Sequence, residues 1–393
     1  MDFRSFQEHN IYCDLLRQLR KNGHQVYCIS PAERRTEVHT HFEDDGYLLK
    51  LKIGNIQKTN LIEKGISTLL IEAQFKAAIQ KYLSHVKFDL VMYSTPPITL
   101  AGAIRYVKER DGAKTYLLLK DIFPQNAVDI GMMSKTGLKA PLYWYFRQKE
   151  KELYKLSDWI GCMSPANVRF VLENNPQVSA ENVEVCPNSI EPQDMRVDSE
   201  GRLAMRRKYA IPEDKTVFVY GGNLGKPQGI PFLIDCLKAQ KENHEAFFLI
   251  VGSGTEYALL ENFVTQAEQA NVKLMRALPR VDYERMIAAC DVGMIFLDHR
   301  FTIPNFPSRL LSYMQAHLPV LACTDSNTDI GEIITGGGFG WWCRSNHVSG
   351  FCENVEKALH SDLTEMGQRG ADYLEKNYHV RSGCDIIESH LDV

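Results

Sequence analysis

The chain has 393 residues, of which 44% are hydrophobic, and a formal net charge of −4 at pH 7. This length suits two domains and this composition is ordinary for a globular protein, whereas the negative charge argues against a general nucleic-acid binder. Residues 1–190 carry +4 and residues 191–393 carry −8, so the first half is the one suited to an anionic membrane or substrate.

The cysteines and the apolar runs indicate the cellular compartment in which the chain is expected. Ten cysteines are scattered from Cys13 to Cys384 without a C-x-x-C pair or a cluster of metal ligands, which is typical of reduced thiols in the cytosol. The start has no signal-peptide pattern, and no run reaches the roughly 18 apolar residues that cross a bilayer. We therefore expect no metal and no other cofactor, and any membrane contact should be peripheral.

The first half alternates helical and strand patterns, and it opens with a helical one. Residues 5–22 have apolar side chains at helical spacing, and a strand is predicted at 25–30. Because α/β domains usually open with a strand, the first strand of this sheet is either missing or lies upstream. Further strands are predicted at 88–93, 115–119 and 159–163. One helix is predicted at 64–83, a second follows Pro97 and ends at about Asp111, and a third begins at Ser164.

Polar residues follow two of these strands. Ser94-Thr-Pro-Pro97 comes after one, and Lys120-Asp121 opens the segment after the next. Ligands of parallel sheets bind at the carboxyl ends of the strands, so these residues mark a candidate binding edge.

Residues 137–151 combine adjacent aromatic residues with basic ones. Tyr143, Trp144, Tyr145 and Phe146 are consecutive, so they cannot all face one core from a helix. An aromatic and basic helix suits a membrane interface. The alternative is a helix that is partly core and partly lid.

A second α/β pattern starts after turn residues at 183–192, where we place the domain boundary. Strands are predicted at 217–220, 246–251, 272–275, 292–297 and 320–323, with helices between them. This alternation predicts a second domain with a parallel sheet.

Three segments of the second domain could bind an anion. Gly221–Gly229 follows the first strand, with glycines at 222, 225 and 229. This spacing matches neither G-x-G-x-x-G nor a Walker motif. It is either a phosphate loop at a helix start or only a tight turn. Asp298, His299 and Arg300 follow another strand and could meet a sugar or phosphate, although a solvated loop histidine is the simpler interpretation.

The third segment is Ile303–Ala322. Pro307 suits a first helical position and Pro319 the end of a helix, with a buried strand after it. Ser308 and Arg309 would then stand at the helix start as an anion site. An ordinary surface helix explains the same pattern.

These segments belong to an ordered series of landmarks. In chain order the landmarks are Ser94-Thr-Pro-Pro97, Leu119-Lys-Asp-Ile-Phe-Pro-Gln-Asn126, Cys186-Pro-Asn-Ser-Ile-Glu191, Gly221–Gly229, Val251-Gly-Ser-Gly-Thr-Glu256, Ala277-Leu-Pro-Arg280, Ala288-Ala-Cys-Asp-Val292, Phe306–Ala322 and Gly337-Gly-Phe-Gly-Trp341. The series resembles the retaining glycosyltransferases of family 4, and its first two landmarks resemble the bacterial capsule, O-antigen and colanic-acid subfamily. The resemblance implies an α/β fold of GT-B type, with two facing Rossmann-like domains at 1–190 and 191–375 and a C-terminal helix at 376–393 that would pack back on the first domain.

The resemblance also implies a donor site in the second domain and an acceptor site in the first. Asp121 is the candidate to orient the acceptor hydroxyl. Donor binding is expected at Gly222, Asn223, Leu224, Lys226, Gln228, Leu278, Arg280, His299, Ser308, Arg309 and Ser312. Among these, Lys226 and Arg309 are the expected diphosphate cations, and Leu278 and Arg280 are expected near the base.

The chain departs from the family in its charged residues. Two glutamates usually flank the donor helix, and Pro304 and Ser312 occupy those positions. The usual arginine and lysine of the phosphate loop fall at Asn223 and Gln228. The diphosphate charge must therefore be met by other groups.

The expected activity is transfer of a sugar from a nucleotide-sugar, UDP-linked, to a polyprenyl-diphosphate-linked acceptor, in the cytoplasm at the inner face of the cell membrane. Residues 137–151 are the expected peripheral membrane contact, and no nucleic acid is expected as a partner. The alternatives are a GT-B nucleotide-sugar 2-epimerase and an inactive scaffold of a polysaccharide assembly complex.

Overall fold

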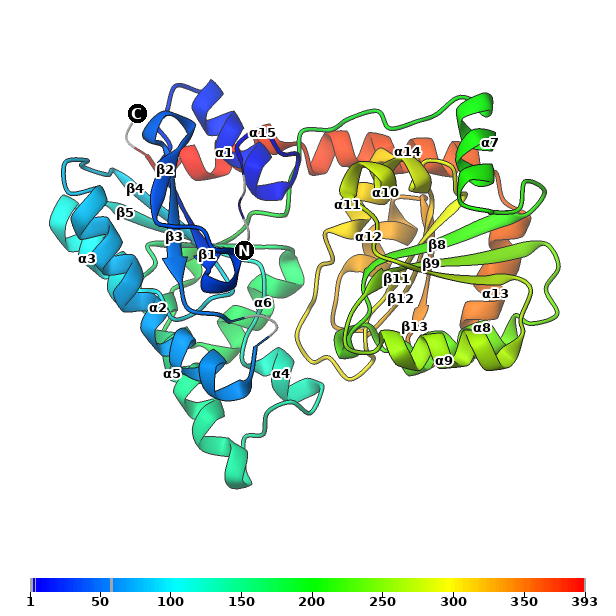
Figure 1. Ribbon diagram of the computed structural model, residues 1–393, viewed down its shortest axis with the longest axis horizontal. Coiled ribbons are helices and arrows are strands. Elements are labelled where there is room, and N and C mark those ends of the chain that lie inside the picture. The colour runs from blue at the N-terminus through cyan, green and yellow to red at the C-terminus, as the bar shows by residue number, and fades with distance from the viewer. Residues whose placement is uncertain (1–2, 4, 57–58, 392–393) are drawn as a thin grey trace. The chain divides into compact units, whose positions relative to one another are not determined.

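The computed structural model describes residues 3, 5–56 and 59–391, and the chain folds into two compact units (Figure 1). Unit 1 is formed by Met1–Glu191 together with His379–Val393, and unit 2 by Pro192–Tyr378. The end of the chain therefore returns to the first unit. Among the described residues, no helix is both long enough and apolar enough to span a membrane.

Unit 1 begins, within the described residues, with a helix rather than a strand. Its elements are α1 (Ile11–Lys21), β1 (Cys28–Glu33), β2 (His41–Glu43), β3 (Leu48–Ile53), α2 (Leu61–Tyr82), β4 (Leu90–Ser94), α3 (Ala101–Asp111), β5 (Lys114–Leu119), α4 (Gln125–Asp129), α5 (Ala140–Leu156), β6 (Trp159–Cys162), α6 (Pro165–Asn174), β7 (Val183–Val185) and α15 (Val380–Glu388). The helix predicted from residue 5 starts at Ile11, because the side chain of Asn10 accepts hydrogen bonds from the N–H groups of Tyr12 and Cys13 and caps it there.

Two sheets form the centre of unit 1. β4, β5, β6 and β7 form a parallel sheet in that order, and β1, β3 and β2 form a smaller one in which only β2 is antiparallel. α1 packs against α15, and both cover the parallel sheet through a buried cluster that includes Leu15, Tyr116 and Cys384. Burial of these side chains ties the end of the chain to unit 1.

Unit 2 alternates strands and helices. Its elements are α7 (Ser199–Lys208), β8 (Thr216–Asn223), α8 (Ile230–Ala239), β9 (Ala246–Ser253), α9 (Tyr257–Ala267), β10 (Val272–Arg276), α10 (Arg280–Ile287), β11 (Val292–Phe296), α11 (Arg309–Gln315), β12 (Val320–Thr324), α12 (Ile330–Gly336), β13 (Gly340–Arg344), α13 (Val348–Leu359) and α14 (Leu363–Asn377). The strands form one parallel sheet in the order β10-β9-β8-β11-β12-β13. The order changes direction at β8 and β11, the kind of switch point at which open α/β sheets bind ligands.

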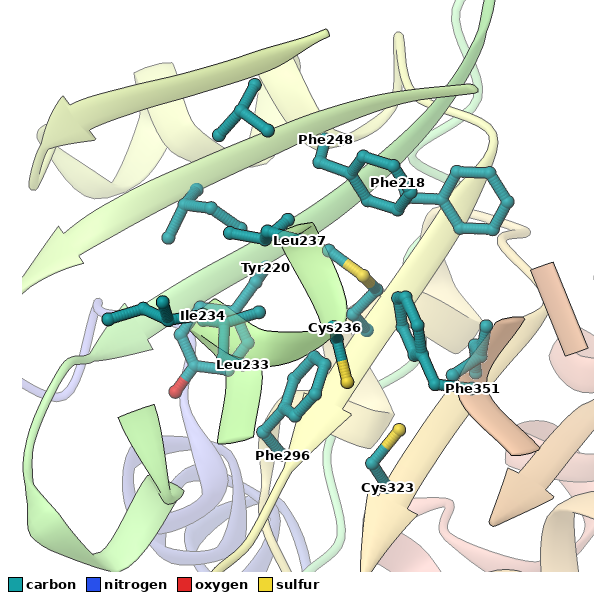
Figure 2. Packing of buried hydrophobic residues seen from close by; sticks show 14 of the residues in the cluster. Phe218, Tyr220, Leu233, Ile234, Cys236, Leu237, Phe248, Phe296, Cys323 and Phe351 are labelled. Atoms are coloured by element: carbon teal, nitrogen blue, oxygen red, sulfur yellow. The ribbon is translucent and has the colours of Figure 1, made fainter. Parts of the chain in front are cut away.

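The core of unit 2 lies between this sheet and its helices (Figure 2). Phe218, Phe248 and Phe296 project from the strands and pack against Leu233 and Phe351, and all five side chains are buried. Strands buried on both faces require continuous apolar runs, as in Val217–Tyr220. The predicted strand positions are confirmed, with ends that differ by up to three residues.

The helix expected from Pro307 to Leu318 is shorter, and this prediction was wrong at both ends. α11 starts at Arg309 and stops at Gln315. It stops because His317 adopts a left-handed conformation, φ +53°, and the N–H of Leu318 bonds back to Tyr313 O at 2.9 Å. Pro319 thus follows the helix end instead of causing it.

Candidate donor site and acceptor-side residues

The segment Gly221–Gly229 is closely packed backbone at the end of β8. Gly222 has φ +125°, which favours glycine, and a Cβ on Gly252 of β9 would lie only 2.0 Å from Gly222 O. The N–H of Leu224 donates to Ser253 O at 2.9 Å. Glycine at 222 and 252 lets the ends of β8 and β9 lie side by side. Gly222 itself is exposed at the surface.

Gln228 holds the loop together from inside. Its Oε1 accepts hydrogen bonds from Asn223 Nδ2 at 2.9 Å and from the N–H of Gly225 at 3.2 Å, and the side chain is buried. This acceptor oxygen is therefore used within the loop. Lys226, in contrast, is exposed. Leu224 is fully buried in the core of unit 2, so only its backbone is placed to meet a ligand.

Tyr313 anchors α11 to the sheet. Its ring lies against Gly293, where a Cβ would come within 2.4 Å of it. Its hydroxyl accepts from the N–H of Gly221 at 3.3 Å and lies 3.2 Å from Val219 O and 3.1 Å from Met294 O. Because Arg309 precedes Tyr313 by four residues, both point to the same side of α11, and the anchor sets the position of Arg309.

Arg309 lies against the end of β8. Its guanidinium carbon is 4.4 Å from the ring centroid of Tyr220, and a Cβ on Gly222 would be 3.4 Å from its Nη2. Its Nη1 is buried without a hydrogen-bond partner. The oxygens of Tyr220, Tyr313 and Tyr283 act on its guanidinium, and within the described residues it makes no ion pair with a carboxylate. The structure thus brings together Arg309 and Gly222, two of the residues expected to bind the donor.

The loop after β11 is fixed by an ion pair. Both oxygens of the buried Asp298 accept hydrogen bonds from the Arg300 guanidinium, at 2.8 and 2.6 Å. The N–H of Asp298 donates to Pro227 O at 2.9 Å, which ties this loop to the glycine segment. His299 is exposed, with Nδ1 3.7 Å from Asp298 Oδ1. The charge of Arg300 is therefore met internally.

The remaining predicted donor residues are spread over two helices. Ser308 is exposed and its side chain makes no capping hydrogen bond to α11, and Ser312 is half-buried. Leu278 is half-buried in the segment before α10, and Arg280 is exposed and donates to Glu284 at 2.6 Å. Arg280 therefore already has a carboxylate partner, which distinguishes it from Arg309.

Asp121 in unit 1 is half-buried and lies beside Asn126 and Thr95. Burial raises its pKa to about 6, against the opposing hydrogen bonds from Asn126 and Ile122. Asn126 Nδ2 donates to Asp121 Oδ1 at 2.7 Å, and Thr95 Oγ1 donates to Asp121 O at 2.9 Å. Tyr12 lies nearby, since Asp121 contributes to the raised pKa of its hydroxyl. A carboxylate that changes charge near neutral pH is suited to orient a hydroxyl group.

Residues 137–151 expose apolar side chains on unit 1. The exposed fractions are 102% for Leu138, 51% for Leu142 and 56% for Trp144. Lys135 and Lys139 beside them are exposed. Two basic residues of the same segment are used internally, because Arg147 pairs with Glu150 and Lys149 with Glu152.

The tyrosines around Arg309 were not predicted from the sequence. Tyr220 immediately precedes the glycine segment, so its position was a usable signal. Tyr283 lies on α10, far away in sequence, and its hydroxyl is so close to Gly221 that a Cβ there would lie 1.8 Å from it. No local pattern could have shown this contact. In the part of the chain that the structure describes, no group of three His, Cys, Asp or Glu side chains could hold a metal ion.

Comparisons with known proteins match this architecture. Residues 10–194 match the model of "Glycosyltransferase Family 4", and residues 201–376 match "Glycosyl transferases group 1". WbjE of Pseudomonas aeruginosa, described as a probable glycosyltransferase, is 25% identical over 83% of this chain and 80% of its own. WcaI of Escherichia coli K12, whose description names colanic acid biosynthesis, is 23% identical over 63% of this chain and 60% of its own.

Solved structures show the same fold. Sucrose-phosphate synthase of Thermosynechococcus elongatus has a TM-score of 0.73 at 13% identity, covering 96% of this chain and 91% of its own. HepE of Anabaena, in complex with UDP and glucose, has a TM-score of 0.65 at 13% identity, covering 87% of this chain and 85% of its own. The predicted GT-B fold of two Rossmann-like domains is confirmed, and the chain belongs to glycosyltransferase family 4.

Proposed function

We propose that the chain transfers a sugar, with retention of configuration, from a UDP-linked nucleotide-sugar to a lipid-linked glycan acceptor in the synthesis of a bacterial surface polysaccharide. The observation that carries this proposal is the guanidinium of Arg309 beside the exposed backbone of Gly222: its Nη1 is buried without a hydrogen-bond partner, and it makes no ion pair within the described residues. The description of WcaI supports the pathway, and the UDP and glucose of HepE support the donor.

In this proposal unit 2 binds the donor. Arg309 and Lys226 neutralise the diphosphate, and the backbone at Gly222 and Asn223 approaches it closely. Leu278 and Arg280 would lie near the base, and His299 and Ser312 near the sugar or ribose. No metal is needed, because these cations meet the charge that develops on the departing diphosphate.

Unit 1 binds the acceptor. The bond between the anomeric carbon and the diphosphate oxygen breaks, and a bond from that carbon to the acceptor oxygen forms on the same face. The acceptor's proton passes to the leaving diphosphate, and Asp121 orients the acceptor hydroxyl. Catalysis then consists mainly of positioning and charge stabilisation.

The exposed side chains of residues 137–151 would place the enzyme on the membrane that carries the acceptor. Trp144 suits the interface between water and lipid, and Lys135 and Lys139 suit anionic headgroups. Leu138→Ser with Trp144→Ser should release the protein from vesicles that contain phosphatidylglycerol. Leu259→Ser on α9, where Leu259 is 44% exposed, is the matched control and should leave binding unchanged. Equal binding of all variants would contradict the membrane contact.

A nucleotide panel tests the proposed function. UDP, GDP, ADP, dTDP and their sugars are screened by thermal shift, since a ligand that binds only the native state raises its stability. The nucleotide-sugar that binds is then labelled in the sugar and incubated with a bacterial lipid extract. Label in the lipid fraction supports the proposal. Binding without transfer to any lipid-linked acceptor favours an inactive scaffold, and the absence of both overturns it.

A further inference from the structure

Unit 2 contains two arginines whose partners differ in kind. Arg206 is buried and paired with Asp291 at 2.6 Å, and it also donates to the carbonyl oxygens of Ala289 and Pro212. Its charge is neutralised inside the fold, as a buried structural arginine requires. Arg309 has no such ion pair in the described part of the chain, and its Nη1 is buried without a partner.

Arg309 is surrounded by three tyrosines, whereas Arg206 has a carboxylate partner. The ring of Tyr220 faces the guanidinium at 4.4 Å, and the Tyr220 hydroxyl donates to Asn223 O at 2.7 Å, which fixes the ring. Burial raises the pKa of Tyr313 to about 12 and also raises the pKa of Tyr220 and of Tyr283. At physiological pH all three hydroxyls are therefore neutral.

An aromatic face attracts a cation and restricts its orientation without cancelling its charge. A carboxylate would orient the guanidinium equally well, but it would compete with any incoming anion for the same donors. The arrangement at Arg309 keeps both the charge and a donor group available to a ligand. This agrees with the absence of glutamates at Pro304 and Ser312.

We infer that Tyr220 is a positioning residue that acts through Arg309, holding the guanidinium in the orientation that binds the diphosphate of the donor. This inference rests on the proposed function, because it takes the anion to be a nucleoside diphosphate. It adds a residue and a contact that the family resemblance did not supply. The contact that carries the inference is the ring face of Tyr220, 4.4 Å from the guanidinium carbon, and the hydroxyl fixes the ring by donating to Asn223 O.

The test compares affinity for UDP with affinity for uridine by calorimetry, or the corresponding pair for whichever of UDP, GDP, ADP and dTDP binds the wild-type protein. The ratio of the two affinities measures the contribution of the diphosphate. Tyr220→Leu should lower this ratio by at least about fivefold, and Tyr220→Phe should keep it within about twofold. Tyr220→Met, which also removes the ring but has a flexible unbranched side chain, replaces the leucine variant if the latter does not fold.

A second variant separates positioning from structural damage. Tyr257→Leu also removes a buried tyrosine of unit 2, one that packs on Arg276 at 3.5 Å, and it should leave the ratio unchanged. In the Arg309→Ala background, Tyr220→Leu should cause no further loss, because its effect passes through Arg309. An unchanged ratio in folded Tyr220→Leu, or a full additional loss in that background, overturns the inference.

The same measurements keep this inference apart from the proposed function. Failure of the wild-type protein to bind any of the four nucleotides contradicts the proposed function itself. A ratio that falls in Arg309→Ala but not in Tyr220→Leu leaves the donor site intact and rejects only the role of Tyr220.

Discussion

The guanidinium carbon of Arg309 lies over the ring of Tyr220, 4.4 Å from the ring centroid. Tyr220 lies in the last half of β8, immediately before the glycine segment, and Arg309 is the first residue of α11. The contact therefore joins the strand that leads into the glycine segment to α11. Arg206, whose partner Asp291 lies beside the start of β8, shows the alternative, a buried arginine neutralised by a carboxylate. The same side chain thus stabilises the fold at one position and remains available for an anion at the other.

Removing the partner of Arg206 should destabilise unit 2. Asp291 accepts hydrogen bonds from Arg202, Arg206 and the N–H of Val217. Asp291→Ala leaves the buried charge of Arg206 unpaired, which costs about 3–5 kcal/mol of unfolding free energy. Urea denaturation measures the change. Asp235→Ala, which removes an exposed pair with Lys238, should cost less than about 1 kcal/mol, and similar losses in both variants would contradict this account.

Activity should depend on the ionisation of Asp121. Its pKa is about 6 because of burial, so it is charged above that pH and neutral below it. If the carboxylate orients the acceptor hydroxyl, kcat/KM falls on the acid side with an apparent pKa of about 6. Asp121→Asn should lower kcat/KM and remove this limb from the pH profile. Persistence of the same limb in the variant would exclude Asp121 as its source.

The same shift predicts a pH-dependent stability. The folded state keeps the Asp121 proton up to about pH 6, whereas a free carboxyl loses it near 3.8. Stability from this group is therefore present below pH 4 and is lost as the pH rises to 6. Relative to wild type, Asp121→Asn should gain up to about 3 kcal/mol between pH 4 and pH 7. Asp235→Asn is the exposed control, and an equal change in both variants would refute the assignment.

Gly221 should not tolerate a side chain. A Cβ there would lie 1.8 Å from the Tyr283 hydroxyl, so Gly221→Ala must displace Tyr283 from the end of β8. We expect a loss of about 1–3 kcal/mol in unfolding free energy. Gly336→Ala in α12 is the control, since a Cβ there meets nothing within 4 Å, and it should be neutral or slightly stabilising. A harmless Gly221→Ala would show that this packing is not required.

The sequence predicted the elements that local patterns determine. Apolar runs such as Val217–Tyr220 favour buried parallel strands. The two parallel sheets, β4-β5-β6-β7 and β10-β9-β8-β11-β12-β13, could therefore be anticipated. The end of α11 could not, because it depends on the left-handed conformation of His317 rather than on Pro319. A non-glycine residue at that φ is uncommon, and composition gives no sign of it.

The candidate site was predictable only in part. Arg309 could be predicted as an anion-binding residue because it stands at the start of an apolar helical stretch. The internal use of Gln228 Oε1 and the ion pair of Arg280 with Glu284 are matters of side-chain geometry. Tyr283 reaches Gly221 from another helix, and such long-range contacts leave no trace at neighbouring positions in the sequence.

The most direct test of the donor site is calorimetry of UDP and uridine, or of the pair that the nucleotide panel selects, with wild-type protein and Arg309→Ala. A charge-assisted contact to phosphate is worth about 1.5–3 kcal/mol, so the variant should bind UDP roughly 10- to 100-fold more weakly and uridine within about twofold of wild type. Arg276→Ala, which removes an arginine stacked on Tyr257, should change neither affinity. Equal losses for UDP and uridine in Arg309→Ala, or no loss for either, would contradict the assignment of Arg309 to the diphosphate.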